Sequence, residues 1–176
     1  MIHWHNKLRD FLAGWLEALT GMPTLTEQPV PKWDKHLPPS AEFPEGRVKM
    51  AQLDVSGFIL GQRTHLDVGF TNAATDNDEE RIMRAQQDGR AARHYVDGKR
   101  SRYPAGDNPG EPMVPFIIEA LGRPSLEAIA FLRSVAPSAP AQRAVVLASA
   151  WQTISIITQT RLAELYISAE RSRPPR

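Results

Sequence analysis

Residues 50–70, MAQLDVSGFILGQRTHLDVGF, constrain the fold of this chain most, because they predict two short strands joined by a tight turn. Leu60 and Gly61 form the predicted turn, since glycine supplies the positive φ that a two-residue hairpin loop needs. Counting back from this turn places Asp54 directly opposite Asp67, each between apolar neighbours. Two facing carboxylates repel one another and weaken a hairpin. Such a local conflict is typical of a functional site.

A divalent cation bound between Asp54 and Asp67 would remove this repulsion, because hard cations take carboxylate oxygens as ligands. The alternative is a different strand register with a turn at Gly57, which leaves two unrelated aspartates on a solvated surface. Glu27 is a candidate third acid near the pair, although a glutamate in such a loop is more often simply exposed. His65, two residues before Asp67, remains open as an alternative metal ligand.

Composition narrows the classes of protein that fit. The 176 residues indicate one domain, and the 41% of apolar residues can form a core. The net charge of +1 gives no overall basic surface, so a nucleic-acid surface would have to be local. The absence of cysteine excludes disulfides, a cysteine nucleophile and zinc sites built on thiolates. No apolar run is long enough to span a membrane, and the N-terminus lacks the layout of a signal peptide.

Apolar periodicity predicts the elements around the hairpin. The expected elements are a helix at 3–19, a short strand at 25–28 within a proline-rich loop at 22–48, a helix at 78–95, a buried strand at 113–121, a helix from Ser125 to Pro137 and a long helix at 143–170. This order predicts an α/β or α+β fold, a small mixed sheet flanked by helices. We expect a single domain over residues 1–170 and a basic, disordered tail at 171–176.

Two stretches suggest contacts with partners. The segment 97–103, DGKRSRY, is the densest basic stretch and follows Arg93, so it predicts either a phosphate-contacting surface or a solvated basic turn. The helix at 143–170 has a wide apolar face, which predicts burial in the core or contact with a partner. His5, at the start of the first helix, is interpreted as structural from its position alone.

Several motifs follow one another at characteristic spacings. His5 and Asn6 open the first helix, and Asp54 and Asp67 follow in the hairpin. The later motifs are Lys99 with Tyr103, the run V-P-F-x-x-E-x-x-G-R from Val114 through Glu119 to Arg123, and Trp151-Gln152, Ser155 and Gln159 in the last helix. In this order they resemble the restriction-like endonuclease domain of site-specific non-LTR retrotransposons, a branch of the PD-(D/E)XK nuclease superfamily.

The resemblance implies a restriction-endonuclease-like core and a metal-dependent DNA endonuclease that nicks DNA at a target site. Asp54 and Asp67 would bind Mg²⁺ or Mn²⁺, and Lys99 would stabilise charge near the attacking water. Glu119 would be a further metal ligand or would orient the lysine. The acid-x-lysine motif of the superfamily is missing, because Leu121 stands where the lysine would follow Glu119.

The resemblance also implies DNA as the partner, contacted through Arg93, Arg100, Arg102 and Arg123. Two other classes remain open. One is a catalytically inactive DNA-binding relic of the same fold, which the missing acid-x-lysine favours. The other is a helical interaction module in which the helix at 143–170 pairs with a partner or with a second copy of the chain. A nuclease would be located in the nucleus of a eukaryote or otherwise in the cytoplasm, and would be neither secreted nor membrane-bound.

Overall fold

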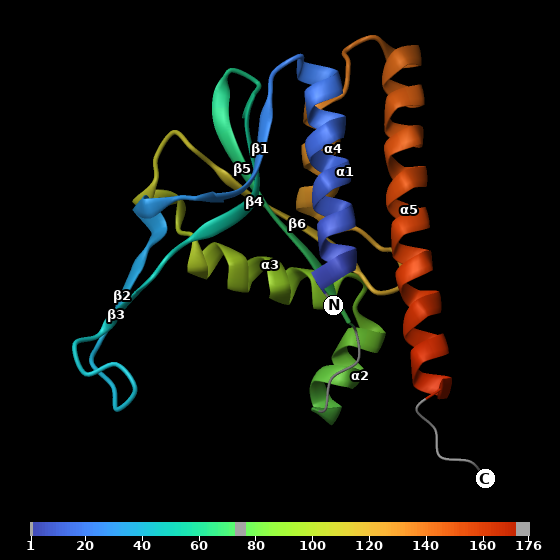
Figure 1. Cartoon of the computed structure of the whole chain (residues 1–176). Coiled ribbons are helices and arrows are strands. Elements are labelled where there is room, and N and C mark those ends of the chain that lie inside the picture. Colours follow the sequence, from blue (N-terminus) through green and yellow to red (C-terminus); the bar gives the residue numbers. More distant parts are fainter. Residues whose placement is uncertain (1, 73–76, 172–176) are drawn as a thin grey trace.

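A four-stranded mixed sheet forms the centre of the structure, a computed structural model that describes residues 2–72 and 77–171 (Figure 1). The strand order is β1-β4-β5-β6, with β1, β4 and β5 antiparallel and β6 parallel to β5. These strands are β1 (Thr24–Pro29), β4 (Gln52–Ile59), β5 (Gln62–Thr71) and β6 (Met113–Glu119). The prediction of a mixed sheet flanked by helices is therefore confirmed, as is the short strand expected within the proline-rich segment.

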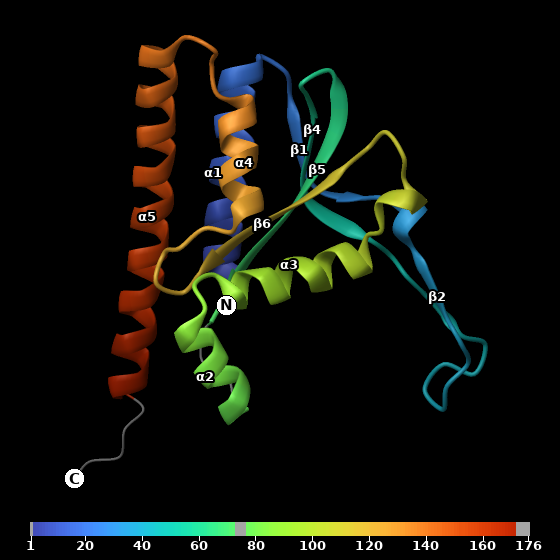
Figure 2. The same ribbon diagram turned by 180° about the vertical axis from the view of Figure 1, so that it is seen from behind.

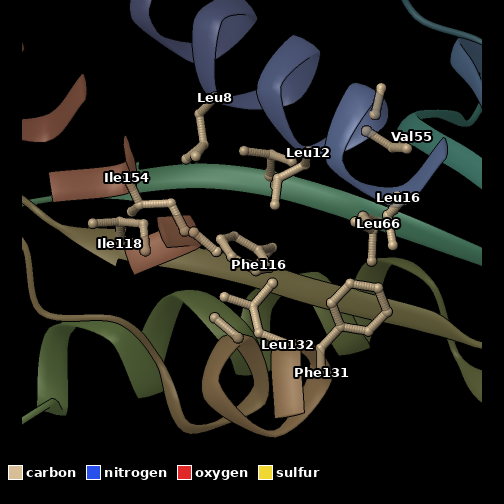
Figure 3. Close-up of a cluster of buried hydrophobic side chains, with 14 of the residues drawn as sticks. Leu8, Leu12, Leu16, Val55, Leu66, Phe116, Ile118, Phe131, Leu132 and Ile154 are labelled. Atoms are coloured by element: carbon tan, nitrogen blue, oxygen red, sulfur yellow. The ribbon is translucent and has the colours of Figure 1, made fainter. Parts of the chain in front are cut away.

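Helices cover both faces of this sheet (Figures 1 and 2). They are α1 (Ile2–Thr20), α2 (Asp78–Gln86), α3 (Arg90–Arg102), α4 (Leu126–Val135) and α5 (Pro140–Arg171). Helices α1, α4 and α5 share one apolar core with the sheet, to which β6 contributes Phe116 and Ile118 (Figure 3). Helix α3 packs on the opposite face, where Val96 contacts Ile117. Neighbouring residues of β6 thus point to opposite layers, as the alternation of a strand requires.

The hairpin has the register that its turn predicts. Leu60 and Gly61 both have positive φ, 51° and 83°, which matches a type I′ turn. The backbone pairs run from Ile59–Gln62 to Val55–Leu66. A turn at Gly57 is excluded, because this glycine pairs with Thr64 in the middle of the hairpin.

One prediction for residues 78–103 is wrong, and one of the two alternatives for its basic stretch is excluded. The expected helix at 78–95 is two helices, because Gly89 precedes α3 with φ +71°, a left-handed conformation that does not continue a helix. The basic stretch 97–103 is not a turn but the last part of α3, which ends at Arg102. The helix continues because Ala92 and Val96 are buried against the sheet and hold it there.

The proline-rich segment contains a second hairpin that the sequence did not predict. Strands β2 (Lys35–Leu37) and β3 (Arg47–Lys49) pair with each other alone, and a short 3₁₀ helix, η1 (Pro31–Trp33), precedes them. This hairpin, residues 35–49, is called the arm below. It projects away from the body on the side opposite α5 in both views (Figures 1 and 2).

Helix α5 begins at Pro140 and ends at Arg171, so it is slightly longer than predicted. Its first half contributes Ala150 and Ile154 to the core, whereas Leu165 and Tyr166 near its end are exposed, so only part of the predicted apolar face is core. The predicted tail begins at Arg171, the last helical residue, and continues through 172–176, which lie outside the described residues. None of the helices in the described part of the chain combines the length and apolar content needed to cross a membrane.

Candidate functional site

Asp54 and Asp67 meet where β4 and β5 separate. The backbone pairs of the hairpin end at Val55–Leu66, beyond which β4 stays with β1 and β5 stays with β6. There the Asp54 side chain replaces a backbone acceptor, because its Oδ2 accepts a hydrogen bond from the Val68 N–H at 2.6 Å. The two carboxylates are also within electrostatic reach, since Asp54 contributes to raising the pKa of Asp67. The predicted pair of acids is thus present at the opening of the sheet.

Lys99 reaches this pair from α3. Its Nζ donates to Asp67 Oδ1 at 2.6 Å, so the structure brings together three residues that lie far apart in the sequence. Asp67 is only 4% exposed, and its Oδ2 has no hydrogen-bond partner among the described residues. We call Asp54, Asp67 and Lys99 the acid–lysine cluster. Its lysine comes from helix α3.

The acid–lysine cluster perturbs the titration of Asp67. Burial raises the pKa of Asp67 to about 6, against the opposing effect of the Lys99 ammonium. The nearby Asp54 carboxylate also contributes to this raised pKa, because a second negative charge disfavours ionisation. Perturbation by burial together with specific charged partners is typical of functional sites.

His5 belongs to this site, although its position in the sequence favoured a structural role. Its Nε2 lies 2.7 Å from Asp54 Oδ1. The hydrogen bond to Asp54 raises the pKa of His5, and burial partly opposes this effect. The only sequence signal for such a role is the His5-Asn6 pair in the family resemblance, because the contact joins α1 to β4 over 49 residues.

Glu119 does not join the acid–lysine cluster. Pro115 is the residue of β6 that pairs with Asp67, and Glu119 lies four residues further along, about 13 Å away at about 3.3 Å per residue. The Glu119 Oε1 accepts a hydrogen bond from the Ala92 N–H at 3.0 Å, in the first turn of α3. Its position therefore corrects the expectation of a metal ligand, because the carboxylate holds the start of the helix that carries Lys99.

His65 and Glu27 also have partners away from the cluster. His65 is buried between Ser56, whose Oγ lies 2.7 Å from Nδ1, and Glu111, whose Oε2 lies 3.4 Å from Nε2. Burial lowers the pKa of His65. Glu27 bulges out of β1 with φ +53°, is 54% exposed at its side chain and pairs with Arg9. Neither residue lies free to complete a metal site.

The predicted DNA-contacting arginines do not form one surface. Arg100 pairs with Glu127 at 2.9 Å, and Arg123 pairs with Asp88 at 2.7 Å. Arg93 lies on the same side of α3 as Arg100, since seven residues separate them, whereas Arg102 points about 160° away from that side. The signal missed in the sequence was this difference in direction within one basic stretch.

Arg102 instead lines a cleft of about 560 Å³ between the arm and the end of α3. Lys35, Arg47 and Lys49 from the arm line the same cleft, and none of the described carboxylates does. Lys35 and Lys49 face each other across the arm strands, which is unfavourable for two like charges. Gln52, two residues before Asp54 and on the same face of β4, also lines this cleft. The arm cleft therefore opens next to the acid–lysine cluster.

The cluster offers a metal ion two carboxylates. Within residues 2–72 and 77–171, no three His, Asp or Glu side chains gather closely enough to hold a metal. Mg²⁺ is often bound through one or two carboxylates, with waters and substrate phosphates completing its octahedron. The buried Asp67 Oδ2, without a hydrogen-bond partner in the described part of the chain, is an oxygen that fits such an ion. Asp54 and Asp67 are therefore the residues that would hold Mg²⁺.

Comparison with known proteins adds no family to this description. No protein-family model matches the chain, and no curated protein sequence matches it. The argument for function therefore depends on the geometry of the site.

Proposed function

We propose that this chain is a Mg²⁺-dependent DNA endonuclease with a restriction-endonuclease-like core, of the PD-(D/E)XK type. The observation that carries this proposal is the acid–lysine cluster at the opening of a mixed sheet. Lys99 Nζ lies 2.6 Å from Asp67 Oδ1, and Asp67 Oδ2 is buried without a hydrogen-bond partner in the described residues. Two acids and an amine that converge in this way suit hydrolysis of a phosphodiester.

Each residue of the site has a distinct role in this proposal. A bound Mg²⁺ would supply an activated water and neutralise charge on the phosphate. Asp54 and Asp67 would position that ion, and Lys99 would stabilise negative charge that develops on the phosphate. His5 would hold Asp54 in place through the contact at 2.7 Å. Glu119 is not part of the proposed site.

The DNA strand would be bound by the arm cleft. Its four cations, Lys35, Arg47, Lys49 and Arg102, form no ion pair with a described carboxylate, so they are available to phosphates. Arg93 also lacks a carboxylate partner among the described residues, whereas Arg100 and Arg123 would have to exchange theirs for DNA. With DNA as its substrate, the protein would be located in the nucleus of a eukaryotic cell, or in the cytoplasm of a cell that has no nucleus.

Nicking of supercoiled plasmid DNA in the presence of Mg²⁺ tests the proposal. We expect the wild type to nick the plasmid and EDTA to stop it. Asp67→Asn should lower the rate by more than about 100-fold, because the metal contributes several kcal/mol to charge stabilisation. Asp97→Asn is the matched control, since Asp97 is exposed on the same helix as Lys99. Equal nicking by wild type and Asp67→Asn would remove the proposal.

A catalytically inactive DNA-binding relic is the second candidate. It is favoured by the ion pair between Lys99 and Asp67, in which the lysine offsets the charge of that carboxylate from within the chain. A relic would bind DNA with a steep dependence on salt, and EDTA would leave both binding and the intact plasmid unchanged. The helical interaction module remains a third candidate, because Leu165, Tyr166 and Ile167 are exposed on α5. A homodimer in sedimentation, without affinity for DNA, would favour it.

A further inference from the structure

Arg161 is a buried cation that the proposed site does not yet use. It lies on α5, one turn after the buried Thr158, and is only 8% exposed. Its Nη1 is buried without a hydrogen-bond partner, and none of the carboxylates in the described residues forms an ion pair with it. The guanidinium instead lies 4.9 Å from the centre of the Phe70 ring. A buried charge without an anion is unfavourable, so a ligand that supplied one would remove this cost.

Arg161 lines an open pocket of about 270 Å³ to which elements from all layers of the fold contribute. His5 from α1, Lys99 from α3 and Arg161 from α5 line it, and no carboxylate of residues 2–72 or 77–171 does. Gly69 of β5 forms part of the wall, and a Cβ there would lie 2.9 Å from the Tyr95 ring. The pocket therefore presents three basic side chains beside a glycine at which any larger residue would displace the Tyr95 ring.

This pocket adjoins the acid–lysine cluster. Lys99 contacts Asp67 at 2.6 Å, and His5 contacts Asp54 at 2.7 Å. These two basic residues thus separate the carboxylates on one side from the Arg161 pocket on the other. A group bound by Arg161 would lie next to an ion held by Asp54 and Asp67.

We propose that the Arg161 pocket binds a phosphate group, with the guanidinium as its principal contact. A guanidinium matches the oxygens of a phosphate with two parallel hydrogen bonds, which makes arginine the residue best suited to such a site. The phosphate would belong to the nucleic-acid backbone, beside the one that is cut. This last point rests on the proposed function, whereas the recognition of phosphate does not.

Binding measured in EDTA, where no cleavage occurs, tests the pocket. A short DNA duplex and inorganic phosphate are titrated separately into the full chain and into Arg161→Met. We expect Arg161→Met to lower affinity for the duplex by about tenfold or more, and to reduce the slope of log K against log salt by about one, because one phosphate contact is lost. The fold should remain intact or gain stability, since a buried unpaired charge is removed.

Two further variants make the result decisive. Arg161→Lys keeps the positive charge but cannot donate two parallel hydrogen bonds, so this variant should bind with intermediate affinity. Arg63→Met removes an exposed arginine near the hairpin turn and should bind like the wild type. A folded Arg161→Met with wild-type affinity and salt slope would overturn the inference, as would an equal loss in Arg63→Met. Phosphate binding that depends on Arg161, without any DNA binding, would support the pocket and count against the proposed function.

Discussion

The two oxygens of the Asp67 carboxylate have different surroundings. Oδ1 accepts a hydrogen bond from Lys99 at 2.6 Å, and Oδ2 is buried without a partner in the described residues. Burial and the Asp54 carboxylate raise the pKa of Asp67 and the Lys99 ammonium lowers it, and the combined effect is a pKa of about 6. The ionisation of Asp67 thus depends on both a neighbouring cation and a neighbouring anion. A change to either neighbour should shift the pKa of Asp67.

Single substitutions should shift the pKa of Asp67 in opposite directions. Lys99→Met should raise it above about 6, because the cation that favours the ionised form is lost. Asp54→Asn should lower it, because a neighbouring negative charge is removed. Titration of the carboxyl carbon by NMR measures both shifts, with Arg63→Met as the unaffected control. An unchanged pKa in both variants would show that the three groups do not interact.

Some residues of the site could be predicted from the sequence and others could not. The placement of Asp54 near Asp67 follows from a local turn, so it could be predicted by counting residues back from that turn. The contacts of His5 and Arg161 depend on where whole helices pack, and the periodicity of a sequence carries no information on that. Arg161 also lies in a stripe with Ala150 and Ile154, where the apolar pattern predicts only core.

Helix α3 shows what sequence patterns miss at the scale of an element. Its path across β5 and β6 brings Lys99 to Asp67, and the break at Gly89 frees it from α2. Glu119 holds the N-terminal turn of α3 at Ala92, and Lys99 follows seven residues later, about 10 Å further along the helix axis. Glu119 therefore supports the position of Lys99 from the far end of the helix.

Substitutions at Glu119 separate this supporting role from a role in binding metal. Glu119→Gln keeps an oxygen acceptor for the Ala92 N–H, so nicking activity should stay within about twofold of wild type. Glu119→Ala removes the acceptor and should lower the free energy of unfolding by about 1 kcal/mol, as loss of a helix cap does. Urea denaturation and the plasmid assay measure the two effects. If Glu119→Gln folded but had no nicking activity, the result would indicate that Glu119 does bind the metal.

The arm changes the molecule as a whole, because it extends the basic surface beyond the compact body (Figure 2). Sequence patterns could not predict it, since β2 and β3 have three residues each, are joined by a segment with three prolines and bury little. The larger elements of the fold were predictable, because α1, α4 and α5 have apolar stripes several turns long. The sequence of the arm is therefore marked by its basic residues, and not by a pattern of buried apolar residues.

Neutralising the arm should weaken DNA binding without loss of stability. Lys35→Gln combined with Lys49→Gln should reduce the slope of log K against log salt by about two, because two phosphate contacts are lost. The free energy of unfolding should stay equal or rise, since two facing like charges are removed. Fluorescence anisotropy with a labelled duplex measures binding, and the pair Arg63→Gln and Arg133→Gln is the control. An unchanged slope would exclude the arm from DNA contact.

The short junction between the arm and the sheet has a consequence for where a cut would fall. Only Met50 and Ala51 separate β3 from β4, so Lys49 and Asp54 lie on nearly one extended stretch. Five residues at about 3.3 Å each span about 16 Å. This equals about five base pairs of a duplex, at about 3.4 Å per pair. The protein would then cut the strand at a fixed distance along the DNA from the phosphates that the arm binds. That distance would not depend on the base sequence in between.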